Sequence, residues 1–341
     1  MRLKIYDAMW LIHFGANSVK YKDFCYAGYP LGGTKFLVKH IVDDLWRHDR
    51  VVVCFDSKTN KNSILAGYKS NRPHSAHIVS QAIFAHNMLL KCGVTAIKRE
   101  GLEADDLIAS VISKYRNEFK DITIVSNDKD TAHNVFKQIK VQAGTSGGID
   151  IEAGNFSVAA AKTPVYYNTL SAYKVLTGDA SDTILAFKSD CGKNGREIYK
   201  DYVMFVEKNV PNNDSKPFIA SKKEIFEYFL KAQKYLSSRD RDELQARASV
   251  VFPTIVDIWE SPSDYNDLSL IDLSRILSVL NDDIALEQIK MKKIKLSVAE
   301  FNDFKSAAQM LKSGAFAAEN DCPVYTSLTL DDVNINMRLF Q

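Results

Sequence analysis

Apolar residues follow two patterns along the first half of the chain, short continuous runs and helical stripes. Residues 2–6 alternate around apolar Leu3 and Ile5 and predict a first strand, and the short apolar runs 51–55, 94–97 and 121–126 predict three more. Helical periodicity marks 33–47, 77–90 and 103–115. Because strands and helices alternate without hairpin turns between the strands, we expect an α/β fold, a mostly parallel sheet flanked by helices.

The remaining segments are less periodic. We expect the apolar segment 8–17 to be a loop leading into a helix, and the run 139–141 to precede a glycine-rich turn at 144–148. Beyond about residue 160 the pattern is mainly helical, with predicted helices at 167–177, 195–208, 222–235, 239–248, 270–280 and 298–312. We therefore predict an α/β core over 1–160, a helical region over 161–320 and an extended tail over 321–341.

Composition narrows the class of protein. The 341 residues are 46% hydrophobic and 25% charged, which is ordinary for a globular protein. No apolar stretch approaches the roughly 20 residues of a membrane span, and the first residues lack the apolar core of a signal peptide. The five cysteines are scattered without a CxxC pair, which favours reduced thiols and no zinc site. We expect a cytoplasmic protein that does not bind membranes.

Three carboxylates, Glu103, Asp105 and Asp106, fall within four residues at the start of a predicted helix. On a helix, Glu103 and Asp106 share a face, so their charges repel each other and need a compensating cation or free solvent. The alternative is a helix N-terminus at which acidic side chains offset the helix dipole.

Other acids repeat this design. Asp7, Asp56 and Asp128 each follow a predicted strand, and ligands of parallel sheets bind at the carboxyl ends of the strands. The whole set is Asp7, Asp56, Glu103, Asp105, Asp106, Asp128, Asp130, Asp179 and Asp182. Oxygen ligands select hard cations, and so many carboxylates fit two Mg²⁺ ions, with Mn²⁺ as a substitute. Setting these nine aside leaves 33 of the 42 acidic residues against 44 basic ones, which suits a polyanionic ligand.

Motifs shared with a known family support the metal prediction. They are Asp7, Phe55-Asp56, Tyr68-Lys69-Ser70-Asn71-Arg72, Glu103 to Ile108, Ile124 to Asp130, and Gly178 to Asp182. In these motifs, and in their order over residues 1–200, the chain resembles the 5′-nuclease family of flap endonucleases and 5′→3′ exonucleases. It is most similar to bacteriophage members, including the phage-type ribonuclease H.

The resemblance implies a PIN-like nuclease core with an arch at about 57–80 and a helix–turn–helix-like DNA-binding element at about 175–205. It implies metal-dependent hydrolysis that leaves a 5′-phosphate. The first five acids of the set would serve one metal ion and the last four a second. Lys69 and Arg72 would approach the scissile phosphate in the arch, where Tyr68 could stack on a base. The alternative for Tyr68 to Arg72 is a solvated basic loop.

This chain departs from the family pattern in two places. The arch segment carries Lys58 and Lys61 where an apolar, arginine-containing segment is usual, and we expect both lysines to contact nucleic acid. After Asp182 the usual proline is missing and the glycines are shifted. Four basic residues could supply positive charge there instead: Lys188, Lys193, Arg196 and Lys200. The alternative is a plain connection between two helices.

Two smaller signals concern the surface and the tail. His74 and His77 have no acidic or cysteine partner nearby in sequence, so we expect surface side chains. The tail residues Met337, Leu339 and Phe340 resemble peptides that dock into a sliding clamp, and such anchors supply most of the binding energy of an interface. The alternative is a tail that folds back onto the protein.

Together these observations predict a monomeric, Mg²⁺-dependent 5′→3′ nuclease of DNA replication or repair, cytoplasmic in a bacterial host if phage-encoded. Its substrates would be branched or primer-bearing duplex DNA and RNA–DNA hybrids. Two alternatives stay open: a non-catalytic junction-binding protein of the same fold, and a PIN-type single-strand ribonuclease.

Overall fold

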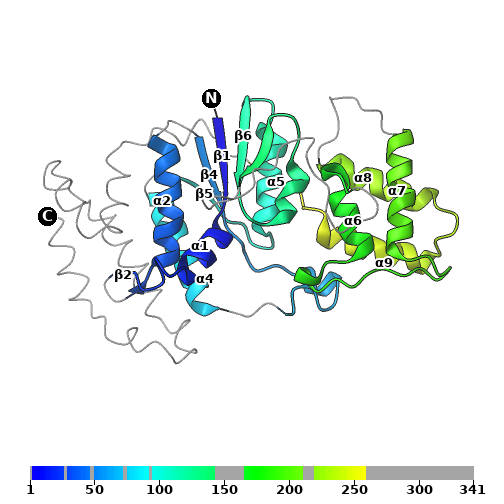
Figure 1. The fold of residues 1–341 in the computed structure, drawn as a ribbon, viewed down its shortest axis with the longest axis horizontal. Helices are drawn as coiled ribbons and strands as arrows, with labels where there is room; N and C mark the ends of the chain where they lie inside the picture. The colour runs from blue at the N-terminus through cyan, green and yellow to red at the C-terminus, as the bar shows by residue number, and fades with distance from the viewer. Residues whose placement is uncertain are drawn as a thin grey trace, which may run out of the picture. The chain divides into compact units, whose positions relative to one another are not determined.

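The computed structural model describes residues 2–26, 29–46, 50–71, 75–91, 94–142, 165–209 and 219–258 (Figure 1). The strands are β1 (Arg2–Asp7), β2 (Cys25–Tyr26), β3 (Tyr29–Pro30), β4 (Arg50–Cys54), β5 (Thr95–Ile97), β6 (Asp121–Val125) and β7 (Ile139–Gln142). The α-helices are α1 (Ala8–Asn17), α2 (Gly32–Trp46), α3 (Lys61–Ile64), α4 (Ala76–Lys91), α5 (Ala104–Tyr115), α6 (Leu170–Thr177), α7 (Gly195–Asn209), α8 (Ile219–Ala232) and α9 (Ser238–Val251). The 3-10 helices are η1 (Lys129–Asn134), η2 (Tyr167–Thr169) and η3 (Ala180–Asp182).

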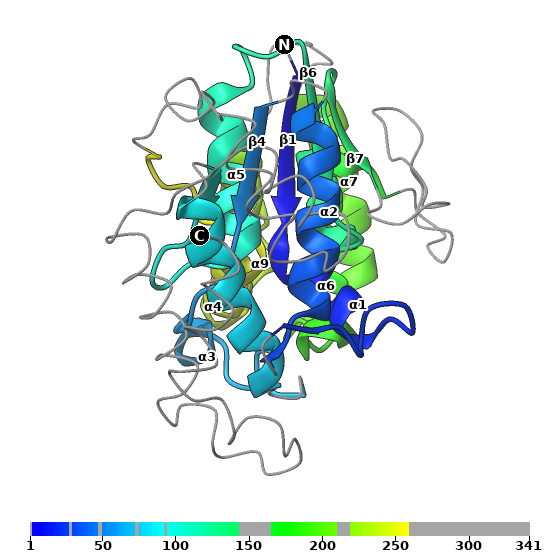
Figure 2. The ribbon, with the colours of Figure 1, turned by 90° about the vertical axis from the view of Figure 1, so that its left-hand side faces the viewer.

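Five strands form one sheet in the order β5-β4-β1-β6-β7. Val52 of β4 lies opposite Thr95 of β5 in a parallel pair. Ile122 of β6 lies opposite Ile139 of β7 in another, and these two strands run side by side in Figure 2. The predicted α/β fold with a parallel sheet is confirmed. The antiparallel pair of β2 and β3, a second sheet, was not predicted from the apolar pattern.

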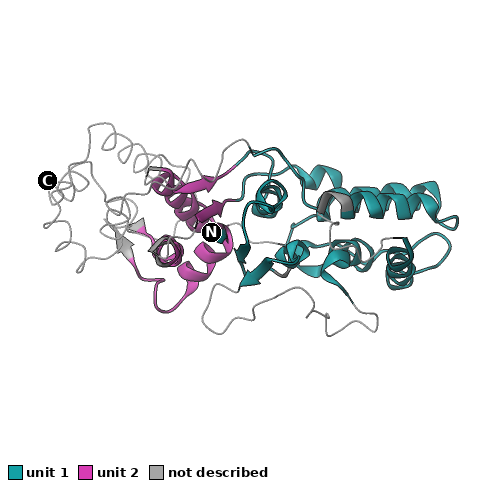
Figure 3. Ribbon diagram, turned by 90° about the horizontal axis from the view of Figure 1, so that it is seen from above, with its two compact units in different colours: residues 1–5, 56–73, 99–259 teal, residues 6–55, 74–98, 260–341 magenta. Residues whose placement is uncertain are grey.

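The chain forms two compact units that are interleaved in sequence (Figure 3). One unit, coloured teal, has its described residues within 1–5, 56–73 and 99–259; the other, coloured magenta, has its described residues within 6–55 and 74–98.

The magenta unit holds helices that pack against one another and against strands. Helices α1, α2 and α4 are in mutual contact, and α2 and α4 also contact β4 and β5, respectively. The prediction that 8–17 is a loop is wrong. Helix α1 starts directly after Asp7, because the Asp7 carboxylate accepts a hydrogen bond from the backbone N–H of Trp10 at 3.2 Å and so caps the helix.

The teal unit combines β6, β7 and α5 with helices α6 to α9. Helix α5 buries its apolar face, including Leu107, Ile108 and Ile112. Helix α6 contacts α7 and α9, and α8 contacts α7 and α9. Arg247 of α9 is buried and donates hydrogen bonds to backbone carbonyls of α6 and of the residues after η3, at Val175 and Leu185. The four helices predicted between 167 and 248 are confirmed, with ends shifted by a few residues.

Several predictions lie outside the described residues and stay predictions. They concern the turn at 144–148, the domain boundary near 160, the helices at 270–280 and 298–312, and the tail 321–341. Within the described residues, no helix combines the length and the apolar character that crossing a membrane requires.

Candidate active site

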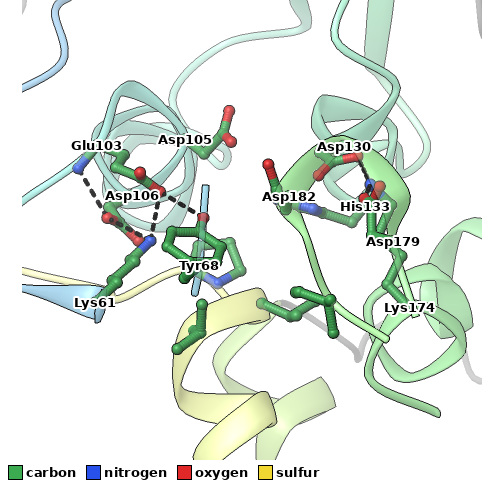
Figure 4. A pocket seen from close by; sticks show the side chains of 14 residues that line it. Lys61, Tyr68, Glu103, Asp105, Asp106, Asp130, His133, Lys174, Asp179 and Asp182 are labelled. Carbon is green, nitrogen blue, oxygen red and sulfur yellow. Dashed lines mark hydrogen bonds and ion pairs between the residues drawn. The ribbon is translucent and has the colours of Figure 1, made fainter. Parts of the chain in front are cut away.

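Charged side chains of the teal unit line a small pocket (Figure 4). The space open to the centre of a water molecule is about 20 Å³. The lining side chains with ionisable groups are Lys61, Tyr68, Glu103, Asp105, Asp106, Asp130, His133, Lys174, Asp179 and Asp182. Carboxylates outnumber lysines in this set by six to two. An excess of negative charge in a partly buried pocket favours the binding of a cation.

Three of these carboxylates converge. Asp130, Asp179 and Asp182 each offer an oxygen, and the three oxygens lie within 4.8 Å of one another. Oxygens on opposite sides of one Mg²⁺ or Mn²⁺ ion are about 4.2 Å apart, because each lies about 2.1 Å from the metal. The 4.8 Å limit is slightly larger than this span, so small side-chain movements would bring the three oxygens around a single hard cation. They are the one such group among the described residues.

Two capped 3-10 helices bring these carboxylates together. Asp128 caps η1 by accepting the backbone N–H of Asp130 at 2.9 Å. Asp179 caps η3 by accepting the backbone N–H and the hydroxyl of Ser181. The spacing of each acidic pair in the sequence is thus the spacing of a cap and its first turn.

Lys174 of α6 balances two of the three acids. Its ammonium group donates hydrogen bonds to both Asp130 and Asp179. Burial by itself would raise the pKa of Asp179, but the hydrogen bonds from Lys174 and Ser181 outweigh burial and hold the pKa below its usual value. The Asp179 carboxylate is therefore ionised near neutral pH, as ligation of a metal requires.

A second group of charges surrounds Glu103 at the start of α5. The Glu103 carboxylate accepts hydrogen bonds from Lys61 at 2.8 Å, Lys69 at 2.7 Å and the hydroxyl of Tyr68 at 3.1 Å. Burial would raise the pKa of Glu103, but Lys69 and Lys61 lower it to about 2. In this structure Glu103 is the counter-ion of two lysines.

Asp106 is fully buried, and both of its oxygens accept hydrogen bonds. One oxygen accepts the backbone N–H of Thr254 at 2.7 Å, and the other accepts the backbone N–H of Glu103 at 2.9 Å. Lys61 lies 3.3 Å from the second oxygen. Asp106 thereby closes a capping box on α5 and ties the segment after α9 to this helix. The alternative of a helix N-terminus is confirmed for this cluster, and its predicted role in binding a metal stays a prediction.

The strand-end aspartates have separate surroundings. Asp56 accepts the backbone N–H of Ala104 at 2.6 Å, which places it at the N-terminus of α5. Asp128 caps η1 and does not line the pocket described above. Asp7 belongs to the magenta unit, where it caps α1. Their predicted roles as metal ligands stay predictions.

The segment from Lys61 to Asn71 folds against η3. The backbone N–H of Lys69 donates to the carbonyl of Asp182 at 2.9 Å, and Asn71 accepts the hydroxyl of Thr183 at 2.8 Å. Lys69 has a φ of 54°, which is uncommon for a residue other than glycine and often marks a functional site. Arg72 lies outside the described residues.

Tyr68 does not fit the expected stacking on a base. Its side chain is only 5% exposed and packs with Ile184 and Val250 in an apolar cluster. Its hydroxyl is directed to Glu103 instead. The ring therefore belongs to the apolar packing at the pocket. His77 is exposed, as predicted, and its ring lies 2.8 Å from the hydroxyl of Ser75.

A hairpin joins α6 to α7 despite the shifted glycines. Lys188 pairs with Asn194 in an antiparallel bridge, and Gly192 at the turn has a φ of 86°. The backbone N–H groups of Ser189, Gly192 and Asn194 are all used inside the hairpin or by the adjacent helix. These three groups are therefore not free to bind phosphate.

Basic side chains remain on the hairpin surface. Lys188, Arg196 and Lys200 are exposed. Lys193 instead donates to Asp201 at 2.8 Å and lies over the ring of Tyr235. Lys58 is exposed, whereas Lys61, predicted to contact nucleic acid, is buried against Glu103.

Two pocket residues were not predicted from the sequence, His133 and Lys174. His133 lies three residues after Asp130 on η1, and Lys174 lies one helical turn before Gly178 on α6. Neither residue belongs to a motif that could be recognised in the sequence. Only the folded arrangement of η1, α6 and η3 places them beside the carboxylates.

Residues 11–159 match the family described as 5′-3′ exonuclease, N-terminal resolvase-like domain. The predicted resemblance to the 5′-nuclease family is confirmed. The matched region includes Asp56, Glu103 and Asp130, whereas Asp179 and Asp182 lie beyond it.

The chain is also similar to individual proteins, among them a DNA polymerase I and a 5′-3′ exonuclease. DNA polymerase I of Caldicellulosiruptor bescii is 27% identical over 211 residues, which cover 57% of this chain and 24% of the polymerase. A 5′-3′ exonuclease of Buchnera aphidicola is 35% identical over 102 residues, covering 29% of this chain and 34% of the exonuclease. The chain thus spans about a quarter to a third of the length of these 5′-nuclease relatives.

A solved structure extends the likeness beyond the matched region. The T5 D15 protein, co-crystallized with metal ions, has a TM-score of 0.50 and 12% identity, and the similarity covers 84% of this chain and 96% of that one. At this identity the likeness concerns the fold alone. It agrees with a 5′-nuclease fold for both the sheet and the helical region.

Proposed function

We propose that this protein is a Mg²⁺-dependent 5′→3′ exonuclease and flap endonuclease, with Mn²⁺ as a substitute ion. It would hydrolyse phosphodiesters near the 5′ ends of branched DNA, or of RNA primers on DNA, during replication or repair. The observation that carries the proposal is the convergence of Asp130, Asp179 and Asp182 in a pocket of excess negative charge. The 5′-nuclease relatives supply the reaction class.

The acids of the pocket would hold the cation. Asp130, Asp179 and Asp182 form the site that the geometry supports, and Glu103 and Asp105 lie in the same pocket for a second ion. A bound ion of this kind lowers the pKa of water and neutralises charge on a phosphodiester. Lys174 now occupies the space beside Asp130 and Asp179 as their counter-ion. Its ammonium would have to move aside, toward the substrate phosphate, when a divalent cation replaces it.

The basic residues around the pocket would position nucleic acid. Lys69 is anchored by its own backbone to η3 and donates to Glu103, so a phosphate between the acids and this lysine would find a preorganised cation. The exposed Lys188, Arg196 and Lys200 on the hairpin and α7 would contact duplex phosphates by charge. Docking of a sliding clamp on the tail remains part of the proposal.

Cleavage of 5′-labelled flap, nicked and RNA–DNA hybrid substrates in Mg²⁺ or Mn²⁺ tests the proposal. We expect the protein to release short products from the 5′ end and Asp179→Asn to abolish cleavage, because this change removes a charged ligand. Asp242→Asn on the exposed face of α9 is the matched control and should cleave like the parent.

Binding of all three substrates without cleavage in either metal would contradict the nuclease and favour the non-catalytic junction-binding alternative. Cleavage of single-stranded RNA alone would favour the PIN-type ribonuclease.

A further inference from the structure

His133 is a buried imidazole beside the three converging carboxylates. The residue is only 4% exposed, and the Nε2 atom of its ring has no hydrogen-bond partner within the described residues. It lines the pocket, and Figure 4 shows its side chain on the same side of the pocket as Asp130, Asp179 and Asp182. Buried polar atoms are nearly always hydrogen-bonded, so an unpartnered one in a charged pocket points to a missing ligand.

The η1 helix fixes the position of His133 relative to Asp130. Both residues belong to η1, three positions apart, and side chains at this spacing eclipse each other on a 3-10 helix. The buried Lys222 of α8 donates to the backbone carbonyl of His133 at 2.6 Å and so holds the end of η1. The imidazole is therefore held by packing and by its backbone, while Nε2 is left for another partner.

The ring of His133 is neutral near pH 7. Burial, and then the positive charges of Lys222 and Lys61, lower the pKa of His133 to about 3. A neutral imidazole has one nitrogen that accepts a hydrogen bond or binds a metal. A water molecule can donate a hydrogen bond to this nitrogen.

Distance decides whether this nitrogen binds the metal ion directly or accepts a hydrogen bond from a water molecule. The carboxylate oxygens of Asp130, Asp179 and Asp182 lie within 4.8 Å of one another, but neither ring nitrogen of His133 belongs to that group. One ion held by all three carboxylates is therefore not placed to take His133 as a direct ligand. A metal-bound water, which extends from the ion by about 2.1 Å, bridges such a gap.

We propose that His133 Nε2 accepts a hydrogen bond from a water molecule bound to the cation that Asp130, Asp179 and Asp182 hold. His133 is then a positioning residue that orients this water and strengthens metal binding through it. The inference rests on the proposed function, since it assumes a divalent cation in this pocket. Groups that contact metal ligands from outside typically change metal affinity by about 10- to 100-fold when they are removed.

Mn²⁺ binding to the full chain tests the proposal without any nucleic acid. The free Mn²⁺ signal in electron paramagnetic resonance gives the dissociation constant for the parent, His133→Gln and His133→Leu. We expect His133→Leu to bind about tenfold more weakly, because the leucine offers no acceptor to the water. His133→Gln should bind within about threefold of the parent, since its amide oxygen restores an acceptor. His86→Leu on α4 of the magenta unit is the control and should leave the affinity unchanged.

A second measurement on the parent protein does not depend on the folding of any variant. The protein is labelled with ¹⁵N-histidine, and pulsed electron paramagnetic resonance of bound Mn²⁺ is recorded. The spectrum should show a weak coupling between Mn²⁺ and the histidine nitrogen, as expected when one water molecule lies between them. No coupling, or unchanged affinity in His133→Leu, would show that His133 only packs and would overturn the inference. A strong coupling would show direct ligation and would also overturn it. In each of these cases the nuclease proposal survives. If the parent does not bind Mn²⁺ at all, both proposals fail.

Discussion

Asp105 and Asp106 are neighbours in sequence with different surroundings. Asp106 is fully buried, and its two oxygens serve Thr254, Glu103 and Lys61. Asp105 is half-buried and lines the pocket. Asp106 also lines the pocket, but its hydrogen bonds assign it to the support of the fold, so the roles of the two acids are separable.

We expect Asp106→Asn to lower the free energy of unfolding by about 3 kcal/mol, because breaking a buried ion pair leaves uncompensated groups. The amide of asparagine cannot accept hydrogen bonds on both sides as the carboxylate does. Asp105→Asn should change the stability by less than about 0.5 kcal/mol. Its effect should instead be a weaker affinity for Mn²⁺, since the pocket loses a negative charge.

Urea unfolding and Mn²⁺ titration of both variants separate the two roles. The assignment would be reversed if Asp106→Asn kept the parental stability and lost Mn²⁺ binding.

The sequence predicted the acidic residues of this pocket, but not which side chains pack against them or pair with them. The acidic pairs at 128/130 and 179/182 follow from capping rules and were recognisable as motifs. The burial of Tyr68 was not, because its partners Ile184 and Val250 are remote in sequence. Nor could the counter-ion role of Lys174 be foreseen, since it depends on how α6 faces η1.

At the scale of elements, Gly178 sets how η3 follows α6. Its φ of 83° and ψ of 170° lie in a region that essentially only glycine adopts. A Cβ atom at this position would lie 2.6 Å from the carbonyl oxygen of Ile184 and 2.7 Å from the backbone nitrogen of Ala186. The close approach is part of the turn that presents Asp179.

Gly178→Ala should therefore displace η3 and weaken Mn²⁺ binding by at least tenfold, together with a loss of stability beyond the 1–3 kcal/mol or so of backbone strain alone. Gly101→Ala is a matched control. Gly101 has a similar φ of 81°, but nothing lies within 4 Å of an added Cβ. It should show the strain without the loss of metal binding.

Thermal unfolding and the Mn²⁺ dissociation constant are measured for both alanine variants. Equal effects of the two substitutions on metal binding would mean that the contact with Ile184 and Ala186 does not position Asp179.

Elements of strong periodicity were predicted well and those shaped by single contacts were not. The buried run 51–55 and the amphipathic α5 came directly from the apolar pattern. Segment 8–17 is apolar on several sides, so periodicity did not mark it as a helix; the cap at Asp7 decides its start. The hairpin between α6 and α7 forms although its glycines depart from the family spacing, because Gly192 alone supplies the left-handed turn.

At the scale of the whole molecule, the balance of charge is nearly even, with a net charge of +2. Six of the 42 acidic side chains line the pocket, where lysines pair with part of them. The hairpin between α6 and α7 and the start of α7 expose basic side chains instead. Long-range attraction of nucleic acid must then come from local patches such as this one, because the net charge is small.

The salt dependence of DNA binding measures how many of these basic side chains reach phosphates. We expect the triple variant Lys188→Ala, Arg196→Ala, Lys200→Ala to reduce the slope of log affinity against log salt by up to about 2.7, since each lost contact to duplex phosphate removes about 0.9. Lys193→Ala is the contrasting variant. Its ammonium is engaged by Asp201 at 2.8 Å, so its loss should change the slope by much less.

Fluorescence anisotropy with a short duplex in EDTA gives these slopes without cleavage, because the chelator removes the metal that hydrolysis would need. Backbone N–H groups of the hairpin are already bonded internally, so the slope should depend on side-chain charge. If the triple variant keeps the parental slope, duplex DNA binds elsewhere and the hairpin is only a connection between helices. If Lys193→Ala reduces the slope as much as each exposed residue does, its ion pair with Asp201 opens on DNA binding.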